Sequence, residues 1–581
     1  MSRKFFILVF LLFWSFNSAS AQKISAASSL DDSDSLRNSY VVLSAVGELT
    51  SGNVRVAYDL LQRARKNNPH SMSVSFYLAK TLLAMDRSEE ALAELQVARA
   101  MDSTNKEFLN LEGQLLINLH QYQQAQVVFE KLIGNTPSDG QNYVLASALA
   151  IEQKNFVDAL AIASRYEALF GFDERIVEIK RVALIAQKRY YEALEYMQTV
   201  VAANPTQVGY LISLGDVSAG LGLDRAAVDL YQRAVALDSS RADGYMALAK
   251  YYDTKGDMAR YIEMLTNIFA LEDVDKDVKI RLFESSFFTS APYRDNLIAI
   301  RRAAQTLLLA HSEQVDVRLL YGRFLTYIGQ IDAATDHYQN MLQAGIASRE
   351  LYDRIMEIQF YRKDYPQALA TATTALVLWP DDGELLARAI TAQWQTGDVR
   401  GAERLAKSSI KRIAARGGAD RDSLLSSLYA LSGDIAHETG NDRRAFAHYE
   451  RALRLTPDNA LVLNNFAYYL SLLGRDLERA LLMAERACTI QKDYPTYIDT
   501  KAWVLFCLAR YEEAAGVQKL ALSLDRGQSS ELMLHYGDIL YALGDDFMAR
   551  TYWKKALDAG AVPDLIDQRL ARPKATKSNA E

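Results

Sequence analysis

The stretch VGYLISLGDVSAGLGLDRAAVDLYQRAVAL, residues 208–237, contains the pattern that decides the fold. In its second half, Ala227, Tyr231 and Ala234 are spaced i, i+4 and i+7, which places them on one stripe of a helix. In its first half, Gly215 lies twelve residues before Ala227, where a small residue lets two helices approach closely. The stretch therefore predicts a pair of packed helices.

The same pattern recurs along the chain every 34 residues, or every 34 or 35 residues in its last part. Ala227 belongs to a series of alanines with this spacing, Tyr261 takes the next place, and two further series follow after gaps. The alanines are Ala57, Ala91, Ala125, Ala159, Ala193 and Ala227, then Ala334, Ala368 and Ala402, then Ala445, Ala480, Ala514 and Ala549. A fixed period of this length is typical of stacked repeats, in which each unit packs on its neighbours.

Other residue types keep a constant distance from these alanines. Twelve residues before them stand Gly113, Gly215, Gly322, Gly433 and Gly537. Four residues after them stand large side chains, among them Phe129, Tyr231, Tyr338, Tyr449 and Trp553. The turn between paired helices is marked by Gly52, Gly256, Gly329, Gly397, Gly440 and Gly544. Proline twelve residues after the alanine ends the second helix in several units.

This pattern resembles the tetratricopeptide repeat. The family's signature is carried by Leu211, Leu214, Gly215, Ala227, Tyr231 and Ala234, and again by Leu431, Gly433, Ala445, Tyr449, Ala452 and Pro457. The resemblance covers nearly all of the chain after residue 37 and implies an all-α superhelical solenoid of about 14–15 helix-turn-helix repeats. It says little about function, because the repeat is a general binding scaffold.

The spacing of the repeats also predicts how the chain is divided. We predict a signal peptide at 1–21, an unstructured linker at 22–37, an array of seven repeats at 38–275, a degenerate repeat or joint at 276–314, an array of three repeats at 315–416, a Gly-containing insertion at 417–425, an array of four repeats at 426–563, a capping helix at 564–571 and a flexible tail at 572–581.

The N-terminus has the features of an export signal. Arg3 and Lys4 precede an apolar run from Phe5 to Trp14, and Ala19–Ala21 fits a signal-peptidase site, so we expect export to the periplasm or the outer membrane. A retained membrane anchor would need a longer apolar run. The net charge of −7 argues against nucleic acid as the main ligand.

No motif for catalysis or cofactor binding is present, so we predict no enzyme, no catalytic residue, no metal and no cofactor. The acidic residues Asp273, Asp275, Asp277 and Glu284 match part of a calcium loop, but Val278 stands where that loop needs glycine. The repeat phase starts a helix here, and acidic residues favour a helix N-terminus. Cys488 and Cys507 fall at opposite ends of antiparallel helices and are predicted to be core thiols without a disulfide.

The resemblance also implies a partner-binding groove. In this family the first helix of each repeat lines the concave surface, and its inward positions from residue 349 onward combine acids with aromatics. These residues are Glu350, Asp353, Glu357, Phe360, Tyr361, Trp394, Asp434, Glu438, Tyr468, Asp499, Trp503, Phe506, Asp538 and Tyr541. Such a surface suits a basic or amphipathic peptide. The alternative is that many of these aromatics pack between neighbouring repeats.

A second candidate surface is a basic stripe. Arg400, Arg404, Lys407 and Lys411 are at helical spacing and would suit an anionic partner or a lipid headgroup, or form an ordinary solvated helix face. Taken together, the sequence predicts a non-catalytic protein-binding scaffold of the cell envelope, associated with membranes only through partners. The alternatives are a regulatory subunit of a cell-wall or secretion enzyme, and an enzyme with an unrecognised site.

Overall fold

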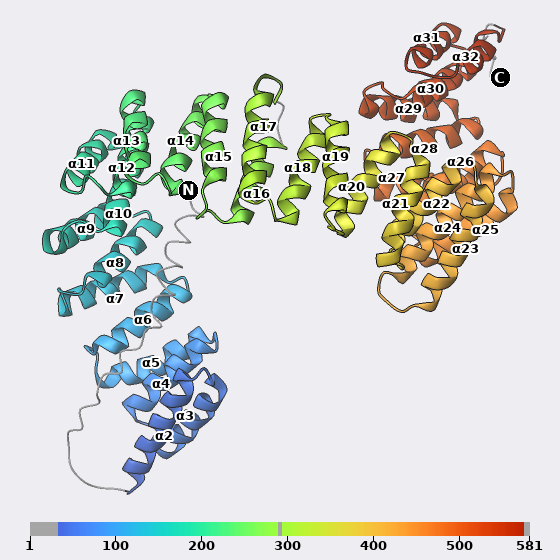
Figure 1. Cartoon of the computed structure of the whole chain (residues 1–581). Helices are drawn as coiled ribbons and strands as arrows, with labels where there is room; N and C mark the ends of the chain where they lie inside the picture. The colour runs from blue at the N-terminus through green and yellow to red at the C-terminus, as the bar shows by residue number, and fades with distance from the viewer. Residues whose placement is uncertain (1–32, 289–292, 574–581) are drawn as a thin grey trace. The chain divides into compact units, whose positions relative to one another are not determined.

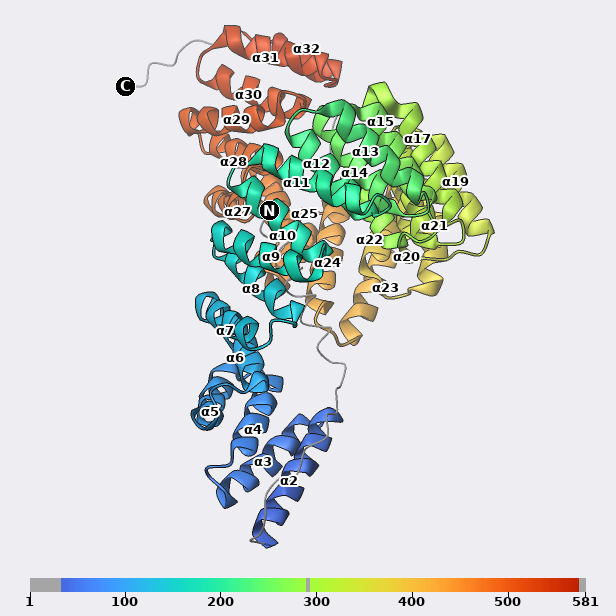
Figure 2. The ribbon, with the colours of Figure 1, turned by 90° about the vertical axis from the view of Figure 1, so that its left-hand side faces the viewer.

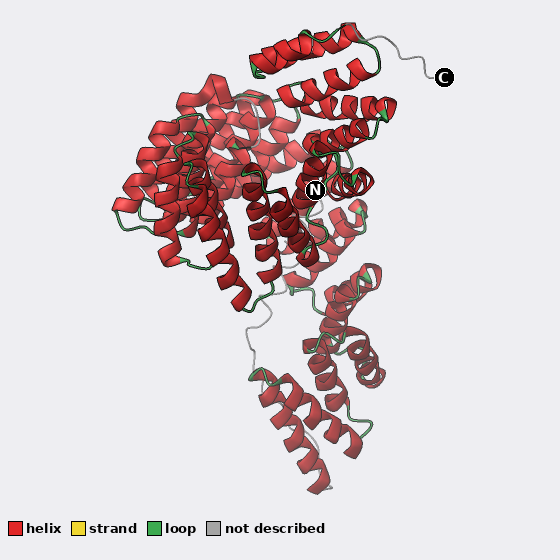
Figure 3. Ribbon diagram, turned by 90° about the vertical axis from the view of Figure 1, so that its right-hand side faces the viewer, coloured by secondary structure: helices red, strands yellow, loops and turns green. Residues whose placement is uncertain are grey.

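The computed structural model describes residues 33–288 and 293–573. Within these ranges every regular element is a helix, and the helices follow one another as antiparallel pairs (Figures 1 and 3). The predicted all-α repeat fold is therefore confirmed. The signal peptide, residues 22–32 of the linker and the tail from residue 574 lie outside the described residues.

The helices group into two compact units, with the boundary between Ser312 and Glu313. In each pair we call the helices first and second. The first unit contains the pairs α2 (Ser33–Thr50) and α3 (Val54–Asn67), α4 (Met72–Ala84) and α5 (Ser88–Met101), α6 (Lys106–Asn118) and α7 (Tyr122–Asn135), α8 (Gly140–Glu152) and α9 (Phe156–Phe170), α10 (Glu174–Ala186) and α11 (Tyr190–Ala203), α12 (Val208–Gly220) and α13 (Asp224–Leu237), α14 (Ala242–Lys255) and α15 (Met258–Ala270), and α16 (Lys276–Phe287) and α17 (Tyr293–Ala310).

The second unit continues the same arrangement and ends on a single short helix. It contains α18 (Val315–Tyr327) and α19 (Ile331–Gln343), α20 (Arg349–Tyr361) and α21 (Tyr365–Leu378), α22 (Gly383–Gln395) and α23 (Val399–Ala415), α24 (Arg421–Glu438) and α25 (Asp442–Leu455), α26 (Ala460–Leu472) and α27 (Leu477–Ile490), α28 (Pro495–Cys507) and α29 (Tyr511–Asp525), α30 (Ser530–Ala542) and α31 (Asp546–Asp558), and then α32 (Pro563–Leu570). Figure 2 shows these successive pairs from the side.

The glycines of the repeat lie directly under the large side chains of the same pair. A Cβ atom on Gly322 would stand 2.2 Å from the ring of Tyr338, and one on Gly215 would stand 2.5 Å from the ring of Tyr231. The same pairing joins Gly113 to Phe129, Gly433 to Tyr449 and Gly537 to Trp553. All the alanines of the 34-residue series are fully buried. The prediction that glycine permits close helix approach is confirmed.

The turn between paired helices places one residue in the left-handed region. All six predicted turn glycines have positive φ, from +72° at Gly256 to +87° at Gly397. The equivalent positions of other repeats hold ordinary residues in the same conformation, namely Asp86, His120, Lys154, Lys188, Lys363 and Ala509. The pairs therefore keep one turn geometry whether or not glycine occupies it, although glycine adopts it with less strain.

Three predicted boundaries differ from the structure. Helix α2 begins at Ser33, so the predicted unstructured linker ends before residue 37. The early start of α2 has a physical reason, because extending a formed helix by a few residues is easier than nucleating one. Residues 421–425 of the predicted insertion form the start of α24, because the extra residues lengthen α23 to 17 residues and α24 to 18. Arg572 and Pro573, predicted to be flexible, hold contacts described below. The remaining division into three arrays stays a prediction.

The last helices of the two units pack in different ways. Helix α32 lies where a capping helix is expected, and its Ile566 is fully buried against the last pair. Helix α17 packs chiefly against α15, not against its own partner α16, which is the degenerate feature of that repeat. Among the described helices, none is long and apolar enough to cross a membrane.

Candidate functional site

The first helices of the second unit form one continuous surface. Helix α26 contacts α28, and α28 contacts α30, although a second helix separates each of these pairs in the sequence. All fourteen predicted groove residues lie on the first helices α20, α22, α24, α26, α28 and α30. Their exposure differs widely, and this decides which of them a partner could reach.

At the α20 end, arginines neutralise the acids of the predicted groove. Asp353 is bound by Arg349 of its own helix and lies 3.8 Å from Arg388 of α22. Glu350 and Glu357 are exposed and both pair with Arg354, at 3.5 and 2.9 Å. These carboxylates therefore form ion pairs along α20 and between α20 and α22, so this end of the surface is not strongly acidic.

Two aromatic side chains near these acids pack inside the repeat array. Phe360 lies against Tyr365 with ring centroids 5.9 Å apart, and Trp394 packs on the apolar cluster around Leu386 and Ile390. For these residues the alternative of packing between helices describes the structure better than a free groove. Tyr361, by contrast, is 77 % exposed at the end of α20.

The middle of the surface holds a half-buried carboxylate. Asp434 of α24 accepts hydrogen bonds from the hydroxyl of Tyr449 at 2.6 Å and from the amide of Asn465 at 3.4 Å. Burial raises the pKa of Asp434, although both hydrogen bonds oppose this shift. Its neighbour Glu438, one turn further along α24, is exposed. Asp434 thus links two neighbouring repeats through its hydrogen bonds, whereas Glu438 remains accessible to solvent.

Helices α28, α29 and α30 share a buried polar cluster. Asp499 is only 3 % exposed and accepts hydrogen bonds from His535 Nδ1, at 2.9 and 3.0 Å from its two oxygens, and from the amide of Gln518. Gln518 also donates to the Leu532 carbonyl at 2.9 Å. Asp499 was predicted to face a partner, but its oxygens are occupied inside the protein. This part of the prediction is wrong, because a buried carboxylate requires internal donors.

The charge state of His535 follows from this cluster. Burial disfavours the imidazolium, but the charge and hydrogen bond of Asp499, together with the charges of Glu531 and Asp538, outweigh burial and raise the pKa of His535 above its ordinary value of 6.5. The environment therefore favours the imidazolium form of His535, which forms an ion pair with Asp499.

An aromatic cluster covers this ion pair. Trp503 stacks on His535 with ring centroids 4.2 Å apart, and Phe506 stacks on Trp503 at 4.8 Å. Tyr468 of α26 lies 6.4 Å from the His535 ring and donates from its hydroxyl to Glu531 at 3.4 Å. Trp503, Phe506 and Tyr468 are half-buried, and Glu531 is exposed. This group, which we call the aromatic platform, combines fixed rings with an accessible carboxylate.

The last groove residues are bound by the C-terminal segment from Arg569 to Pro573, which we call the capping segment. Asp538 is 4 % exposed, and its carboxylate accepts hydrogen bonds from Arg569 of α32 at 2.7 to 3.0 Å and from Arg572 at 3.4 Å. Tyr541 donates to the Pro573 carbonyl at 3.0 Å, and Arg572 lies 5.5 Å from its ring. The Asp538 carboxylate and the Tyr541 hydroxyl, which the sequence assigns to a partner, are thus bound by the capping segment, while the Tyr541 ring stays partly exposed.

Sequence reasoning missed the internal partners of these acids. His535, Gln518 and Arg569 lie 36, 19 and 31 residues from the carboxylates that they bind. Residues about 34 positions apart lie on neighbouring first helices. A basic residue at about that distance from an inward acid could therefore have indicated that the acid has an internal partner.

The basic stripe lies on α23, a second helix, and its four side chains are exposed. The opposite face of α23 is buried through Ala402, Ala406 and Ile413. The predicted geometry of the stripe is thus present.

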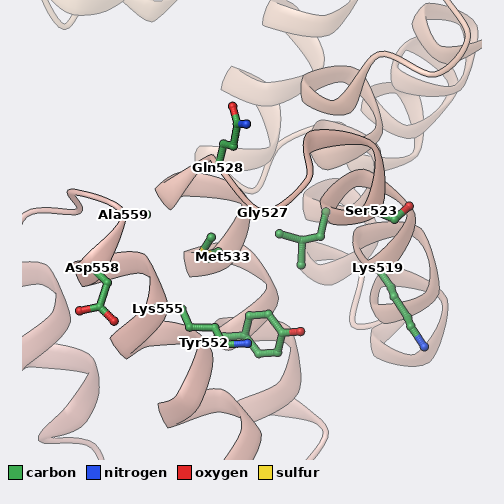
Figure 4. Close-up of a pocket in the computed structure, with 10 residues that line it drawn as sticks. Lys519, Ser523, Gly527, Gln528, Met533, Tyr552, Lys555, Asp558 and Ala559 are labelled. Carbon is green, nitrogen blue, oxygen red and sulfur yellow. The ribbon is translucent and has the colours of Figure 1, made fainter.

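An open pocket of about 810 Å³ lies between α29, α30 and α31 (Figure 4). Lys519 and Lys555 line it together with Asp558 and Ser523. The ammonium group of Lys555 lies 4.8 Å from the Tyr552 ring, and the Ser523 hydroxyl donates to the Leu520 carbonyl. The lining contains neither histidine nor cysteine.

The acidic stretch before α16 acts as a helix cap. The carboxylate of Asp275 accepts hydrogen bonds from the backbone amides of Asp277 and Val278 at 2.9 and 3.2 Å. Within the described residues no group of three or more potential ligands could hold a metal ion. The capping interpretation is confirmed for Asp275, and Asp277 lies in the first turn of the same helix. Cys488 and Cys507 are free thiols, and burial raises the pKa of Cys507 to about 11.

Replacing Asp275 with alanine should destabilise the start of α16 by about 1 kcal/mol, the usual loss for an N-cap side chain. Hydrogen exchange of the α16 amides would measure this. Calcium chloride should leave the exchange of the wild-type protein unchanged. Protection that rises with calcium in the wild type and not in the variant would restore the calcium-loop interpretation.

Comparisons with known proteins agree with the fold. Family models described as "Tetratricopeptide repeat" match residues 48–115, 182–242 and 426–459. A search of curated proteins found no match.

Similar solved structures include three of low identity. The APC/C hetero-tetramer Cut9–Hcn1 is 13 % identical, with 81 % of this chain and 96 % of that chain covered and a TM-score of 0.36. A tetratricopeptide repeat protein from Parabacteroides merdae is 14 % identical, with 42 % and 97 % covered and a TM-score of 0.31. MamA from Desulfovibrio magneticus is 22 % identical, with 29 % and 96 % covered and a TM-score of 0.26.

The paired helices, the buried alanine series and three matched segments agree with one another. Such repeats are generally non-catalytic scaffolds for protein–protein interaction. The chain therefore carries tetratricopeptide repeats, and its fold is an all-α tetratricopeptide-repeat solenoid.

Proposed function

We propose that this chain is an exported scaffold of the cell envelope that holds a basic or amphipathic segment of a partner protein on the first-helix surface of its second unit. The observation that carries the proposal is the aromatic platform of Tyr468, Trp503, Phe506 and His535, with Glu531 beside it. Rigid, half-buried rings lose little conformational entropy on binding, and an adjacent carboxylate selects a cationic side chain.

The exposed residues refine the expected site. Of the fourteen predicted groove residues, four are exposed, namely Glu350, Glu357, Tyr361 and Glu438, and Tyr468, Trp503 and Phe506 are partly accessible. Glu350 and Glu357 already pair with Arg354. A partner's apolar side chains would lie on the rings, and its lysine or arginine would reach Glu438 or Glu531. We therefore place the partner segment along the first helices from α20, where Tyr361 is exposed, to α28, away from Asp499 and Asp538, whose carboxylates are internally paired.

The capping segment supports the same chemistry. Arg572 lies 5.5 Å from the Tyr541 ring and 5.8 Å from the Trp553 ring while its guanidinium also reaches Asp538. An arginine over an aromatic ring beside an acid is a favourable arrangement. The same combination of groups recurs at the aromatic platform, where no arginine of residues 33–288 and 293–573 lies over the rings of Trp503 or Phe506.

Site-specific photocrosslinking in cells tests this proposal. A benzophenone amino acid would replace Tyr361 or Tyr468 on the first-helix surface, and Tyr191, which is 78 % exposed on the second helix α11, would serve as the control. We expect a discrete protein adduct in the envelope fraction from Tyr361 and Tyr468 and none from Tyr191. The crosslinked peptide, identified by mass spectrometry, should be basic or amphipathic.

Two results would contradict the proposal. Adducts from Tyr191 alone would move the partner to the second-helix side. A protein that fractionates only with the cytoplasm would remove the envelope role and the export signal, even if the first-helix surface still captured a partner.

A further inference from the structure

The four cations of α23 have no ion-pair partner among the described residues. Arg400, Arg404, Lys407 and Lys411 are all exposed, and no carboxylate lies within ion-pair distance of any of them. Arg412 of the same helix, by contrast, forms an ion pair with Asp381 at 2.9 Å. The charge of Asp398 interacts with that of Arg404, although the two do not form an ion pair. Four cations in one row repel one another and leave a positive potential along the helix.

Helix α25 extends the positive surface into the next repeat. Relative to the buried alanines Ala402 and Ala445, Arg443 occupies the position of Arg400, and Arg454 occupies that of Lys411. Glu450 stands at the position of Lys407, and it pairs with Arg479 of α27 at 2.5 Å. The two helices are neighbours, because Arg444 Nη1 lies 2.8 Å from Glu403 Oε1. Helix α23 carries five basic and one acidic side chain, and α25 carries four basic and two acidic ones. The chain as a whole has a net charge of −7, so this surface is locally opposite in sign.

The positive surface of α23 and α25 ends at the second helices of the repeats on either side. On one side, α21 contains no charged side chain. On the other side, α27 places Glu478 and Glu485 at the positions that Arg400 and Lys407 hold in α23. The positive charge is therefore confined to two repeats, which is not expected of a generally solvated outer face.

The four-cation row is also unusual among the second helices that follow the alanine series. At the same four positions, α3 and α25 carry two cations each, and the remaining helices of the series carry one or none. A solvent-exposed helix face requires polar side chains at these positions, but it does not require them all to be cations. The four cations of α23 therefore indicate a binding site for an anionic ligand.

We infer that α23 and α25 form a docking surface for an acidic segment of a partner protein. The surface is formed by second helices, and its chemistry is opposite to that of the aromatic platform, so it adds a second kind of partner. Neither α23 nor α25 has an exposed large hydrophobic side chain. Bilayer-binding surfaces usually add apolar or aromatic anchors to their cations, so an acidic protein segment fits better than a membrane.

Binding of a fluorescein-labelled oligo-glutamate peptide to the full chain tests this inference. We expect saturable binding that weakens as sodium chloride rises from about 50 to about 300 mM, because the charges are solvent-exposed. The variant R400E/R404E/K407E/K411E should weaken binding by about tenfold or more. The milder variant R400Q/R404Q/K407Q/K411Q should weaken it by about threefold or more, and it covers the case in which the charge reversal disturbs folding.

A matched control is available elsewhere on the chain. Arg55, Lys66, Arg225 and Lys554 are likewise two arginines and two lysines, exposed on second helices and without a recorded ion pair. Reversing these four should change the affinity by less than about twofold if the surface itself is recognised. An equal loss in both reversal variants would reduce the effect to net charge and overturn the inference. So would wild-type binding to phosphatidylglycerol vesicles without binding to the peptide. Neither result bears on the aromatic platform.

Discussion

Replacing Asp499 with alanine is expected to destabilise helices α28 to α30 by about 3–5 kcal/mol. The substitution leaves the buried imidazolium of His535 and the buried amide of Gln518 without their shared acceptor. Removing one partner of a buried ion pair is costly because the remaining charge stays desolvated. Hydrogen exchange of the full chain should show the loss as faster exchange across these three helices, with the first unit unaffected.

The same pair should make the stability of the second unit depend on pH. The pKa of His535 in the folded protein is raised above its ordinary value of 6.5. A raised folded pKa means that the stabilisation is complete below about pH 6.5 and is lost as the pH rises through the folded value. The destabilisation by Asp499→Ala should therefore be largest in mild acid and smaller at alkaline pH.

The variant His535→Gln provides the control, because it keeps a hydrogen-bond donor but cannot titrate. It should remove the pH dependence of exchange in α28 to α30 over this range. If Asp499→Ala left the exchange of these helices unchanged and lowered only partner binding, Asp499 would be a binding residue after all, and the internal role assigned to it would be wrong.

Replacing Gly322 with alanine is expected to destabilise the pair α18 and α19 by about 1–3 kcal/mol. The new Cβ atom would stand 2.2 and 2.5 Å from two ring carbons of Tyr338 and 2.8 Å from its hydroxyl oxygen, closer than packed atoms allow. Tyr338 is fully buried, so its ring cannot move aside without displacing its own neighbours. Hydrogen exchange of the α18 and α19 amides would measure the effect.

Gly516→Ala in α29 is the matched control. Its Cβ atom would meet nothing within 4 Å, so the higher helix propensity of alanine should stabilise the helix by up to about 1 kcal/mol. The two substitutions should thus have opposite signs. Destabilisation of similar size at both positions would show that close approach to Tyr338 is not what Gly322 provides.

Much of the fold could be predicted from spacing alone. The buried alanine series, the glycines under Tyr231 and Tyr338, and the turn glycines all stand where a local pattern indicates them. The exceptions are informative. Lys154 and Ala509 take the left-handed turn conformation without glycine, because packing of the two helices fixes the turn between them and outweighs the local preference.

The candidate site was predictable only in part. The family pattern correctly placed Trp503 and Tyr468 on first helices, but it also included Asp499 and Asp538, whose carboxylates bind His535 and Arg569. A sequence shows that an acid is on the inward stripe of a helix. It does not show whether a donor from the next repeat already occupies that acid.

The sequence by itself determined the repeat, its period and the helical face that each residue occupies, because these depend on neighbours within one hairpin. The tertiary structure alone decided which inward side chains remain accessible and where the repeats divide into two units. Those outcomes depend on how side chains about 34 residues apart meet across stacked helices, and on whether a polar group finds its partner inside the protein or in solvent.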